Sequence, residues 1–174
     1  MIIHLGMSGR LKIKKKYFQK VKHDHFIINF SNNYVLIYND PRRFGFIDIV
    51  KTTKLLNKKY ISSLGIDALS KKLTLNYMYG KICKSTIPIK QLLLNQYIVG
   101  GIGNIYANEI LFEAKISPLT LGKNLSFDQI LSVIKSIKKI LKKAIKFGGS
   151  SIKDYKSADG TLGNFQSNFK VYGR

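Results

Sequence analysis

The sequence has one cysteine, few acidic residues and no long apolar run. Cys83 is the single cysteine in 174 residues, which excludes a disulfide scaffold and any Cys₄ or Cys₂His₂ zinc site built by this chain alone. No apolar segment reaches the roughly 18 residues of a membrane span, and the start lacks a signal-peptide hydrophobic region. These absences predict a cytoplasmic protein of one ordinary domain or two small ones.

Acidic residues are scarce, with 9 Asp and Glu against 30 Lys and Arg, so the formal net charge is +21. A field of this size attracts polyanions, and nucleic acid is the first partner to consider. Lys, Ile and Asn share A/T-rich codons, so part of the lysine excess can come from the base composition of the genome. In that alternative the lysines form a solvated surface without a partner. The few arginines are therefore more informative than the lysines: Arg10, Arg42, Arg43 and Arg174.

Patterns typical of hydrolases and metal sites are also missing. The two glutamates, Glu109 and Glu113, are spaced i, i+4 and are expected on a helix surface rather than as an acid/base pair. There is no Gly-x-Ser-x-Gly elbow, and Cys83 has no base placed beside it. His23 and His25 lie two residues apart without a clustered set of metal ligands, so we expect no metal site.

Residues 1–50 have the pattern of β-strands. Segments 26–30 and 34–38 are rich in β-branched and aromatic residues and flank the turn residues 31–33, which predicts a hairpin. Residues 46–50 predict another short strand. Residues 51–70 are polar and irregular, and we interpret them as a connection between two parts of the chain.

From about residue 71 the periodicity becomes helical. Segments 89–94 and 104–114 predict two helices separated by glycines. The clearest helix runs from Ser126 to about residue 147, because Ser126 and Gln129 have the spacing of a capping box. A glycine-rich loop over 149–163 follows, and the alternation over 165–172 predicts a terminal strand.

The glycine-rich corner over 100–104 is the most informative local feature. Glycines let another molecule approach the backbone closely, and the helix that follows offers unpaired N–H groups to an anion. A dinucleotide fingerprint needs a preceding strand and a small residue where Tyr106 stands, and the preceding segment looks helical. Binding of a nucleic-acid phosphate fits better, with a ligand-free interhelical turn as the alternative.

Two loops contain the other candidate residues. Residues 39–45 combine an arginine pair with Phe44, the equipment of proteins that open a duplex and wedge it. The alternative is a turn with solvated arginines and a phenylalanine packed on the core. Residues 4–11 place His4, Met7 and Arg10 around glycines, although a lone Met or His is more often structural.

Taken together, these motifs resemble the bacterial formamidopyrimidine-DNA glycosylases. The resemblance covers essentially the whole chain, and the motifs follow one another in the same order. They lie at residues 4–11, 22–25, 40–45, 101–109, 148–160 and 171–174.

The resemblance implies an α+β fold with two domains. Residues 1–60 would form the C-terminal part of a catalytic β-sandwich, so that the sandwich is partial. Residues 61–174 would form a helix-two-turn-helix DNA-binding domain with a lesion-recognition loop. Family members are base-excision-repair glycosylases and AP lyases that remove oxidised purines such as 8-oxoguanine and formamidopyrimidines. The implied partner is double-stranded DNA with such lesions, bound by a monomer, with no role for a membrane.

The resemblance also implies roles for individual residues. Met7, Arg42 and Phe44 match the side chains that fill the gap left by the flipped base, whose extrusion costs a few kcal/mol of stacking. Seven further positions match DNA contacts: His4, Arg43 and Asn104 at phosphates, Gly103 at the glycine corner, His23 in the Lys-His-Asp-His motif, Lys84 beside a usually basic position, and Lys153 in the loop that closes over the damaged base.

Two departures from the family pattern concern catalysis and zinc. The family's nucleophile is an N-terminal proline followed by a glutamate, whereas this chain begins Met1-Ile2-Ile3, which matches an internal strand. The chain also stops at Arg174, before the family's four-cysteine zinc finger. We therefore expect a polypeptide truncated at both ends, with no catalytic residue, no zinc finger and no cofactor, that binds DNA without catalysis.

Other interpretations remain. The chain is alternatively a nonenzymatic DNA-binding relic, or one half of a split or frameshifted enzyme that associates with a separately encoded N-terminal fragment. A third hypothesis is a product that does not fold stably, because half of its β-sandwich is missing and strand edges are left unpaired.

Overall fold

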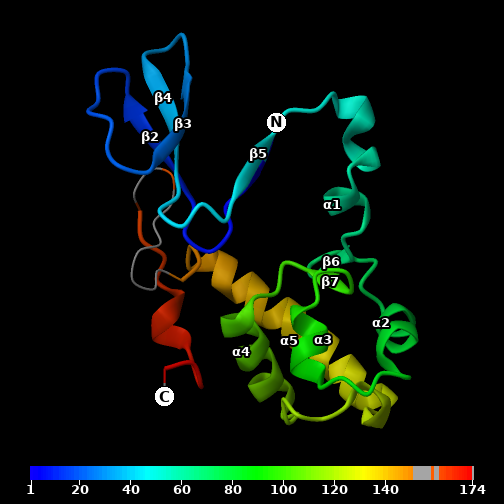
Figure 1. Ribbon diagram of the computed structural model, residues 1–174. Helices are drawn as coiled ribbons and strands as arrows, with labels where there is room; N and C mark the ends of the chain where they lie inside the picture. Colours follow the sequence, from blue (N-terminus) through cyan, green and yellow to red (C-terminus); the bar gives the residue numbers. More distant parts are fainter. Residues whose placement is uncertain (151–157, 159–160, 174) are drawn as a thin grey trace. The chain divides into compact units, whose positions relative to one another are not determined.

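A computed structural model describes residues 1–150, 158 and 161–173 (Figure 1). The chain forms two compact units. Unit 1 comprises Met1–Leu55 with Gly148–Gln166, and unit 2 comprises Leu56–Phe147 with Ser167–Arg174. Strands dominate the first and helices the second, which confirms the predicted α+β class. In the described part of the chain, no helix is long and apolar enough to cross a membrane.

Unit 1 contains two small antiparallel sheets. In the three-stranded sheet, β4 (Tyr34–Asn39) lies between β2 (Arg10–Lys15) and β3 (Asp24–Asn29). The β3–β4 hairpin is the one that the sequence predicts. In the second sheet, β1 (Ile2–His4) pairs with β5 (Phe46–Asp48). One candidate loop follows β1 directly and the other directly precedes β5, so both begin or end at this strand pair.

The two faces of the three-stranded sheet differ in burial. Val35 and Ile37 of the central strand are buried and share one face. On the other face the register places Ile13 opposite Leu36, and Leu36 is half-buried while Ile13 is 48% exposed. This second face is therefore apolar but incompletely covered.

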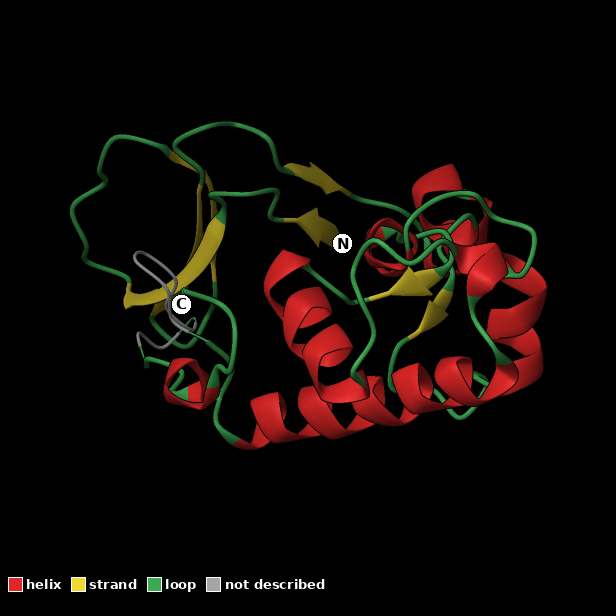
Figure 2. Cartoon of the chain, turned by 90° about the horizontal axis from the view of Figure 1, so that it is seen from below, coloured by secondary structure: helices red, strands yellow, loops and turns green. Residues whose placement is uncertain are grey.

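Unit 2 is built around the long helix α5 (Phe127–Lys146), and the other helices of the unit lie on one side of it (Figure 2). Ser126 accepts a hydrogen bond from Gln129 N–H and Gln129 returns one to Ser126 N–H, which confirms the predicted capping box. The buried face of α5 is apolar and packs on the neighbouring helices: Ile130, Val133, Ile134, Ile137, Ile140, Leu141 and Ala144.

Shorter elements complete unit 2. The α-helices are α1 (Lys59–Ser62), α2 (Leu75–Ile82), α3 (Ile89–Leu94) and α4 (Asn104–Ala114). Two-residue strands β6 (Ile66–Asp67) and β7 (Val99–Gly100) pair in parallel, and a 3₁₀ turn lies at η2 (Gly122–Asn124). Another 3₁₀ turn, η1 (Thr52–Asn57), spans the point in the chain where unit 1 ends and unit 2 begins. The predicted helices 89–94 and 104–114 are therefore confirmed, whereas residues 51–70 are more structured than expected.

The predicted terminal strand over residues 165–172 is wrong. These residues begin with the 3₁₀ turn η3 (Phe165–Asn168) and continue without a strand partner among the described residues. The physical reason lies in α4, where the Glu109 carboxylate accepts hydrogen bonds from the N–H groups of residues 170–172. Those N–H groups are consequently not available to a sheet.

Candidate nucleic-acid interface

Asp40 organises the two candidate loops of unit 1. Its carboxylate accepts hydrogen bonds from Ser8 Oγ at 2.6 Å, Tyr38 Oη at 2.9 Å and Gly45 N–H at 2.9 Å. A longer bond of 3.3 Å comes from Arg42 N–H. Asp40 is fully buried, so its carboxylate fixes the loop over residues 40–45 on the loop over residues 5–9.

The hydrogen bonds also fix the protonation states of this cluster. The Ser8 hydroxyl and the Gly45 N–H hold the pKa of the Asp40 carboxyl well below its ordinary value of 3.8. Burial, together with the neighbouring Asp40 carboxylate, raises the pKa of Tyr38 to about 12. The pair therefore works as an ionised acceptor with a neutral hydroxyl donor at physiological pH.

The tips of the two loops carry exposed side chains. Met7 is 80% exposed and Phe44 is 58% exposed. The Arg42 guanidinium carbon lies 4.4 Å from the centroid of the Phe44 ring, a cation–π contact that holds both side chains together. Single exposed apolar side chains are common on protein surfaces, so the feature that distinguishes Met7 and Phe44 is that the hydrogen bonds to Asp40 hold their two loops together.

Glycines allow the two loops to pack closely. Gly6 has a φ of 61°, and a Cβ there would lie 2.8 Å from the carbonyl carbon of Phe44. A Cβ on Gly45 would lie 2.0 Å from Tyr38 Oη and 2.3 Å from the His4 carbonyl oxygen. No larger residue fits at either position without moving the backbone, so glycine is required for this juxtaposition.

His4, His23 and Arg43 border the same loops. The His4 ring stacks on Phe46 with centroids 5.4 Å apart, and His4 Nδ1 accepts a hydrogen bond from Gly6 N–H. His23 and Arg43 both have positive φ, at 75° and 55°, a conformation that costs energy in non-glycine residues. Such strain is concentrated at functional sites.

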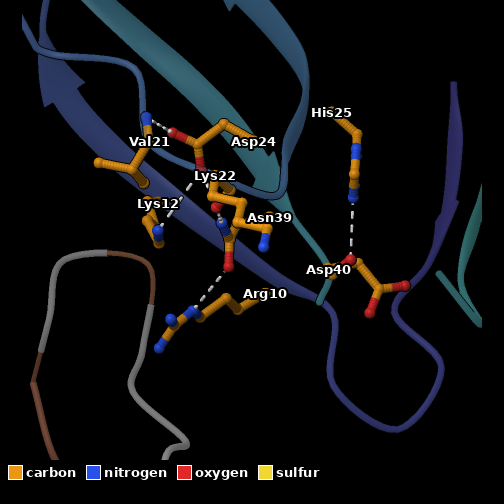
Figure 3. A network of polar contacts seen from close by, with 8 residues as sticks. All are labelled: Arg10, Lys12, Val21, Lys22, Asp24, His25, Asn39 and Asp40. Atoms are coloured by element: carbon orange, nitrogen blue, oxygen red, sulfur yellow. Dashed lines mark hydrogen bonds and ion pairs between the residues drawn. The ribbon is translucent and has the colours of Figure 1, made fainter. Parts of the chain in front are cut away.

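Next to the two loops, a polar network joins side chains of the three-stranded sheet (Figure 3). Asn39 accepts a hydrogen bond from Arg10 Nε at 3.2 Å and donates one to Asp24 Oδ1 at 2.7 Å. Burial raises the pKa of Asp24, but the Val21 N–H, Asn39 and Lys12 outweigh burial, so the net shift is downward. On a separate branch, His25 Nε2 lies 2.9 Å from the Asp40 carbonyl oxygen.

In unit 2, the glycine corner leads directly into α4. The segment before it ends in the short strand β7, not in a helix as the sequence suggested. Gln96 holds the corner in place: its Nε2 donates to the Ile102 carbonyl at 2.9 Å, and its Oε1 accepts from Gly101 N–H at 2.9 Å. The corner is thus shaped by the side chain of Gln96, which precedes it in the chain.

Gly103 is the N-cap of α4, and no side chain caps the helix there. Its φ of −105° suits any residue, and a Cβ would meet no atom within 4 Å. The fold itself therefore does not demand glycine at Gly103. Because no side chain caps it, the start of α4 can present backbone N–H groups to an anion, with Asn104 exposed there.

The remaining predicted site residues lie apart. Lys84 is exposed just after α2, next to its C-cap Cys83. Lys153 lies outside the described residues. Across the residues that the structure does describe, no group of three His, Cys, Asp or Glu side chains could hold a metal ion.

The structure brings together residues that the sequence could not connect. His4, Met7, His23, Arg42, Arg43 and Phe44 all belong to unit 1, whereas Lys84, Gly103 and Asn104 belong to unit 2. Sequence reasoning missed Asp40 and Gln96. The Asp-Pro pair at Asp40 is typical of a turn whose carboxylate binds nearby N–H groups, but Gln96 carries no such signal.

The expected surface position of the two glutamates is wrong for one of them. Glu109 is only 2% exposed, and its carboxylate accepts N–H bonds of 2.8, 3.0 and 2.9 Å from residues 170, 171 and 172. Glu113 is nearer the surface and pairs with Lys139 and Lys170, whose hydrogen bonds lower its pKa. Both glutamates are therefore structural clamps rather than an acid/base pair.

Comparison with known families gives two matches. Residues 64–156 match the family described as formamidopyrimidine-DNA glycosylase H2TH domain, and residues 1–47 match the formamidopyrimidine-DNA glycosylase N-terminal domain. The formamidopyrimidine-DNA glycosylase of Zymomonas mobilis is 49% identical over all 174 residues, which cover 64% of that protein. That of Rickettsia felis is 46% identical, with 63% covered. The chain thus spans less than two thirds of the length of these relatives.

Solved structures agree with the sequence matches. A Lactococcus lactis FPG mutant bound to Fapy-dG containing DNA superposes with a TM-score of 0.90 at 36% identity. The Lactococcus lactis Fpg bound to abasic-site DNA gives a TM-score of 0.89 at 37% identity. Each comparison covers 98% of this chain and 62% of the other.

Proposed function

Because the chain belongs to the formamidopyrimidine-DNA glycosylase family, we propose that it binds duplex DNA at oxidised purines and holds the damaged nucleotide out of the stack. Structures of relatives contain Fapy-dG, abasic-site or carbocyclic 8-oxo-G DNA, which supports a lesion-bearing duplex as the partner. The net charge of +21 favours the same partner.

The observation that carries the proposal is the exposure of Met7 and Phe44 on two loops joined through Asp40. Extruding a base leaves a gap in the duplex and costs a few kcal/mol of stacking. Apolar side chains that enter the gap offset this cost. The Arg42 guanidinium beside Phe44 would add hydrogen-bond donors for the base left without a partner.

The phosphate contacts follow from polar groups in each unit. In unit 1, His4 and Arg43 border the loops, and His23 lies beside them because its carbonyl accepts a hydrogen bond from Asp40 N–H at 3.0 Å. In unit 2, the open N-terminus of α4 at Gly103 and Asn104 suits a phosphate, because helix N-H groups and the helix dipole both attract anions. Lys84 and Lys153 would add charge.

We further propose that the polypeptide of residues 1–174, tested alone, binds DNA without glycosylase or lyase activity. The resemblance assigns the family's nucleophile and acid to an N-terminal Pro-Glu pair, and no residue of this chain matches them. Borohydride trapping on a duplex with 8-oxoguanine tests the statement. The expected result is no covalent adduct despite measurable binding, and an adduct would overturn it.

A second candidate function is that of a partner for a separate N-terminal polypeptide. The favouring observation is the incompletely covered face of the three-stranded sheet, where Ile13 and Tyr34 are 48% and 44% exposed. The register places Leu11, Ile28 and Leu36 on the same half-buried face. Such a face is stabilised when a second layer covers it.

Adding a peptide with the family's N-terminal Pro-Glu start separates the two candidates. If the chain is half of a split enzyme, the peptide should reduce the binding of an apolar dye to the sheet face and should restore borohydride trapping. A peptide of the same composition in scrambled order serves as the control. Dye binding and trapping that do not respond to the peptide would leave the nonenzymatic DNA-binding function.

A further inference from the structure

Helix α5 carries a surface made almost entirely of lysine. Its 20 residues include six lysines and a single acidic residue, Asp128 in the first turn. At 3.6 residues per turn, all six lysines fall within about 140° of the helix circumference. They lie opposite the apolar face of the helix, and none of them belongs to the candidate interface. The six are Lys135, Lys138, Lys139, Lys142, Lys143 and Lys146.

Two of the six lysines are engaged within the protein. Lys139 pairs with Glu113, and Lys143 lies 5.9 Å from the centroid of the Phe147 ring. Lys135, Lys138, Lys142 and Lys146 form no ion pair with any residue that the structure describes. We call these four residues the α5 lysine face.

The geometry of the α5 lysine face suits a polyanion with regularly spaced charges. The four lysines lie within about 80° of arc, and they extend over about 16 Å of the helix at 1.5 Å per residue. Duplex DNA carries a phosphate every 3.4 Å along each strand. A helix of this length can therefore bring several ammonium groups to one stretch of backbone.

A membrane surface fits the same helix less well. Basic amphipathic helices bind membranes by inserting their apolar face, but the apolar face of α5 is buried against α2 and α4. The exposed apolar side chains of α5 are Phe127 and Ile145, near its two ends, and they form no continuous apolar face that could insert into a bilayer. Phosphate groups along a nucleic-acid backbone need only the charge of the lysines.

We propose that the α5 lysine face binds the phosphate backbone of duplex DNA, independently of any lesion. Lysine presents a flexible point charge rather than a planar fork, so the contact selects charge and not sequence. It would increase the residence of the chain on undamaged DNA and leave lesion recognition to the loops of unit 1. Undamaged DNA consequently tests this face separately from the lesion-binding function.

The experiment measures binding of the 174-residue chain to a short undamaged duplex as a function of salt. The affinity of a protein for B-DNA falls with salt on a log–log scale, with a slope of about −0.9 per phosphate neutralised. The variant K135Q/K138Q/K142Q/K146Q keeps helix propensity, since Gln and Lys are close on that scale. If each of the four lysines neutralises one phosphate, its slope should be shallower than that of the parent by about 3.6.

A matched control removes four exposed lysines elsewhere in unit 2: K59Q/K71Q/K72Q/K123Q. This control loses the same net charge, but its lysines are spread over the unit and are not expected to contact one stretch of phosphates, so its slope should change by less than about 1. Equal changes in the two variants would overturn the proposal, because they would show that only net charge matters. An unchanged slope in the α5 variant would do so as well, and so would loss of binding to phosphatidylserine vesicles without a change on DNA.

The corresponding Lys→Arg variant at the four positions keeps the charge and should keep the parent slope. Circular dichroism establishes whether each variant is folded, and we expect all of them to be, because Lys135, Lys142 and Lys146 are exposed and Lys138 is only half-buried. If the Gln variant nevertheless unfolds, the Arg variant and single substitutions at Lys142 and Lys146 still report the slope. A single substitution should reduce it by about 0.9.

Discussion

Ser8 and Asp40, 32 residues apart in the chain, are joined by a hydrogen bond of 2.6 Å from Ser8 Oγ to Asp40 Oδ1. The same hydroxyl accepts a longer bond from Arg42 N–H at 3.3 Å. Ser8 follows Met7, and Asp40 precedes the Arg-Arg-Phe segment. One short contact therefore places the exposed side chains of two loops next to each other.

Asp40→Asn should disorder both loops. All four groups that contact the carboxylate donate hydrogen bonds to it. In the asparagine variant the amide NH₂ is itself a donor, so at least one of these groups would lose its acceptor. The melting temperature should fall, and the preference for lesion-bearing DNA should drop on the order of tenfold. Differential scanning fluorimetry and fluorescence anisotropy measure these effects.

Ser8→Ala removes one of the four donors, so it should have a smaller effect in the same direction. Asp128→Asn, at an exposed position in the first turn of α5, is the control for loss of a negative charge and should leave lesion preference unchanged. If Asp40→Asn and Asp128→Asn behaved alike, Asp40 would not organise the loops.

Acid should destabilise the chain through Asp40. The carboxyl has a pKa below 3.8 in the folded protein, because of the Ser8 hydroxyl and the Gly45 N–H, and returns to its ordinary value when the chain unfolds. Its stabilising effect is thus fully present above pH 3.8 and is lost as pH falls from 3.8 toward the folded pKa. The pKa values of Asp24 and Glu113 are lowered too and act in the same direction.

Urea unfolding at a series of pH values measures this linkage. The midpoint for the parent chain should fall as pH drops below 3.8, and Asp40→Asn should show a weaker fall over the same range. Parallel curves for the two proteins would contradict the assignment of acid sensitivity to Asp40.

Two glycines should respond in opposite ways to substitution. Gly103→Ser supplies an N-cap side chain to α4 in open space, so stability should change by only a few tenths of a kcal/mol. The new hydroxyl competes for the helix N–H groups, and DNA affinity should fall about tenfold. Gly45→Ala instead places a Cβ against Tyr38 Oη and should cost about 1–3 kcal/mol of stability.

Chemical denaturation and DNA titration separate the two effects. A Gly103→Ser variant that binds DNA as well as the parent would show that the N-terminus of α4 is a turn without a ligand. A Gly45→Ala variant of unchanged stability would contradict the close packing of the two loops.

Glu109→Gln should release the C-terminal residues from unit 2. Three N–H groups bond to this buried carboxylate, and bonds to a charged acceptor are worth about 1.5–3 kcal/mol each. The amide keeps one acceptor oxygen, so the expected loss of stability is about 2 kcal/mol. Hydrogen exchange at residues 170–172 should become faster.

The neighbouring Glu113→Gln provides the control. Its partners Lys139 and Lys170 are largely exposed, and such pairs contribute about 0–1 kcal/mol. Exchange at residues 170–172 should therefore stay slow. Equal acceleration in both variants would show that general charge, rather than the Glu109 clamp, holds this segment.

Elements with local signals could be predicted from the sequence. The hairpin of β3 and β4 is encoded by β-branched and aromatic runs around turn residues, and α5 by its capping box and apolar periodicity. The helix of residues 104–114 also follows from local periodicity. Each of these elements depends on interactions between residues that are near in the chain.

Features that depend on distant partners could not be predicted. Residues 165–172 alternate like a strand, but Glu109 takes the N–H groups of three of them across about 60 residues. Asp40 looked like one more turn residue because its partner Ser8 lies in another loop. The exposed residues Met7 and Phe44 were found by motif, whereas the carboxylate that positions them was not.

The most direct measurement compares the affinity of the 174-residue chain for two duplexes that differ only by an 8-oxoguanine. Met7→Ala/Phe44→Ala is the test variant, and Leu119→Ala, another exposed apolar side chain, is its control. The parent and the control should prefer the lesion duplex by about tenfold, and the double variant should bind both duplexes equally. Equal affinity of the parent for the two duplexes would contradict lesion recognition by these loops.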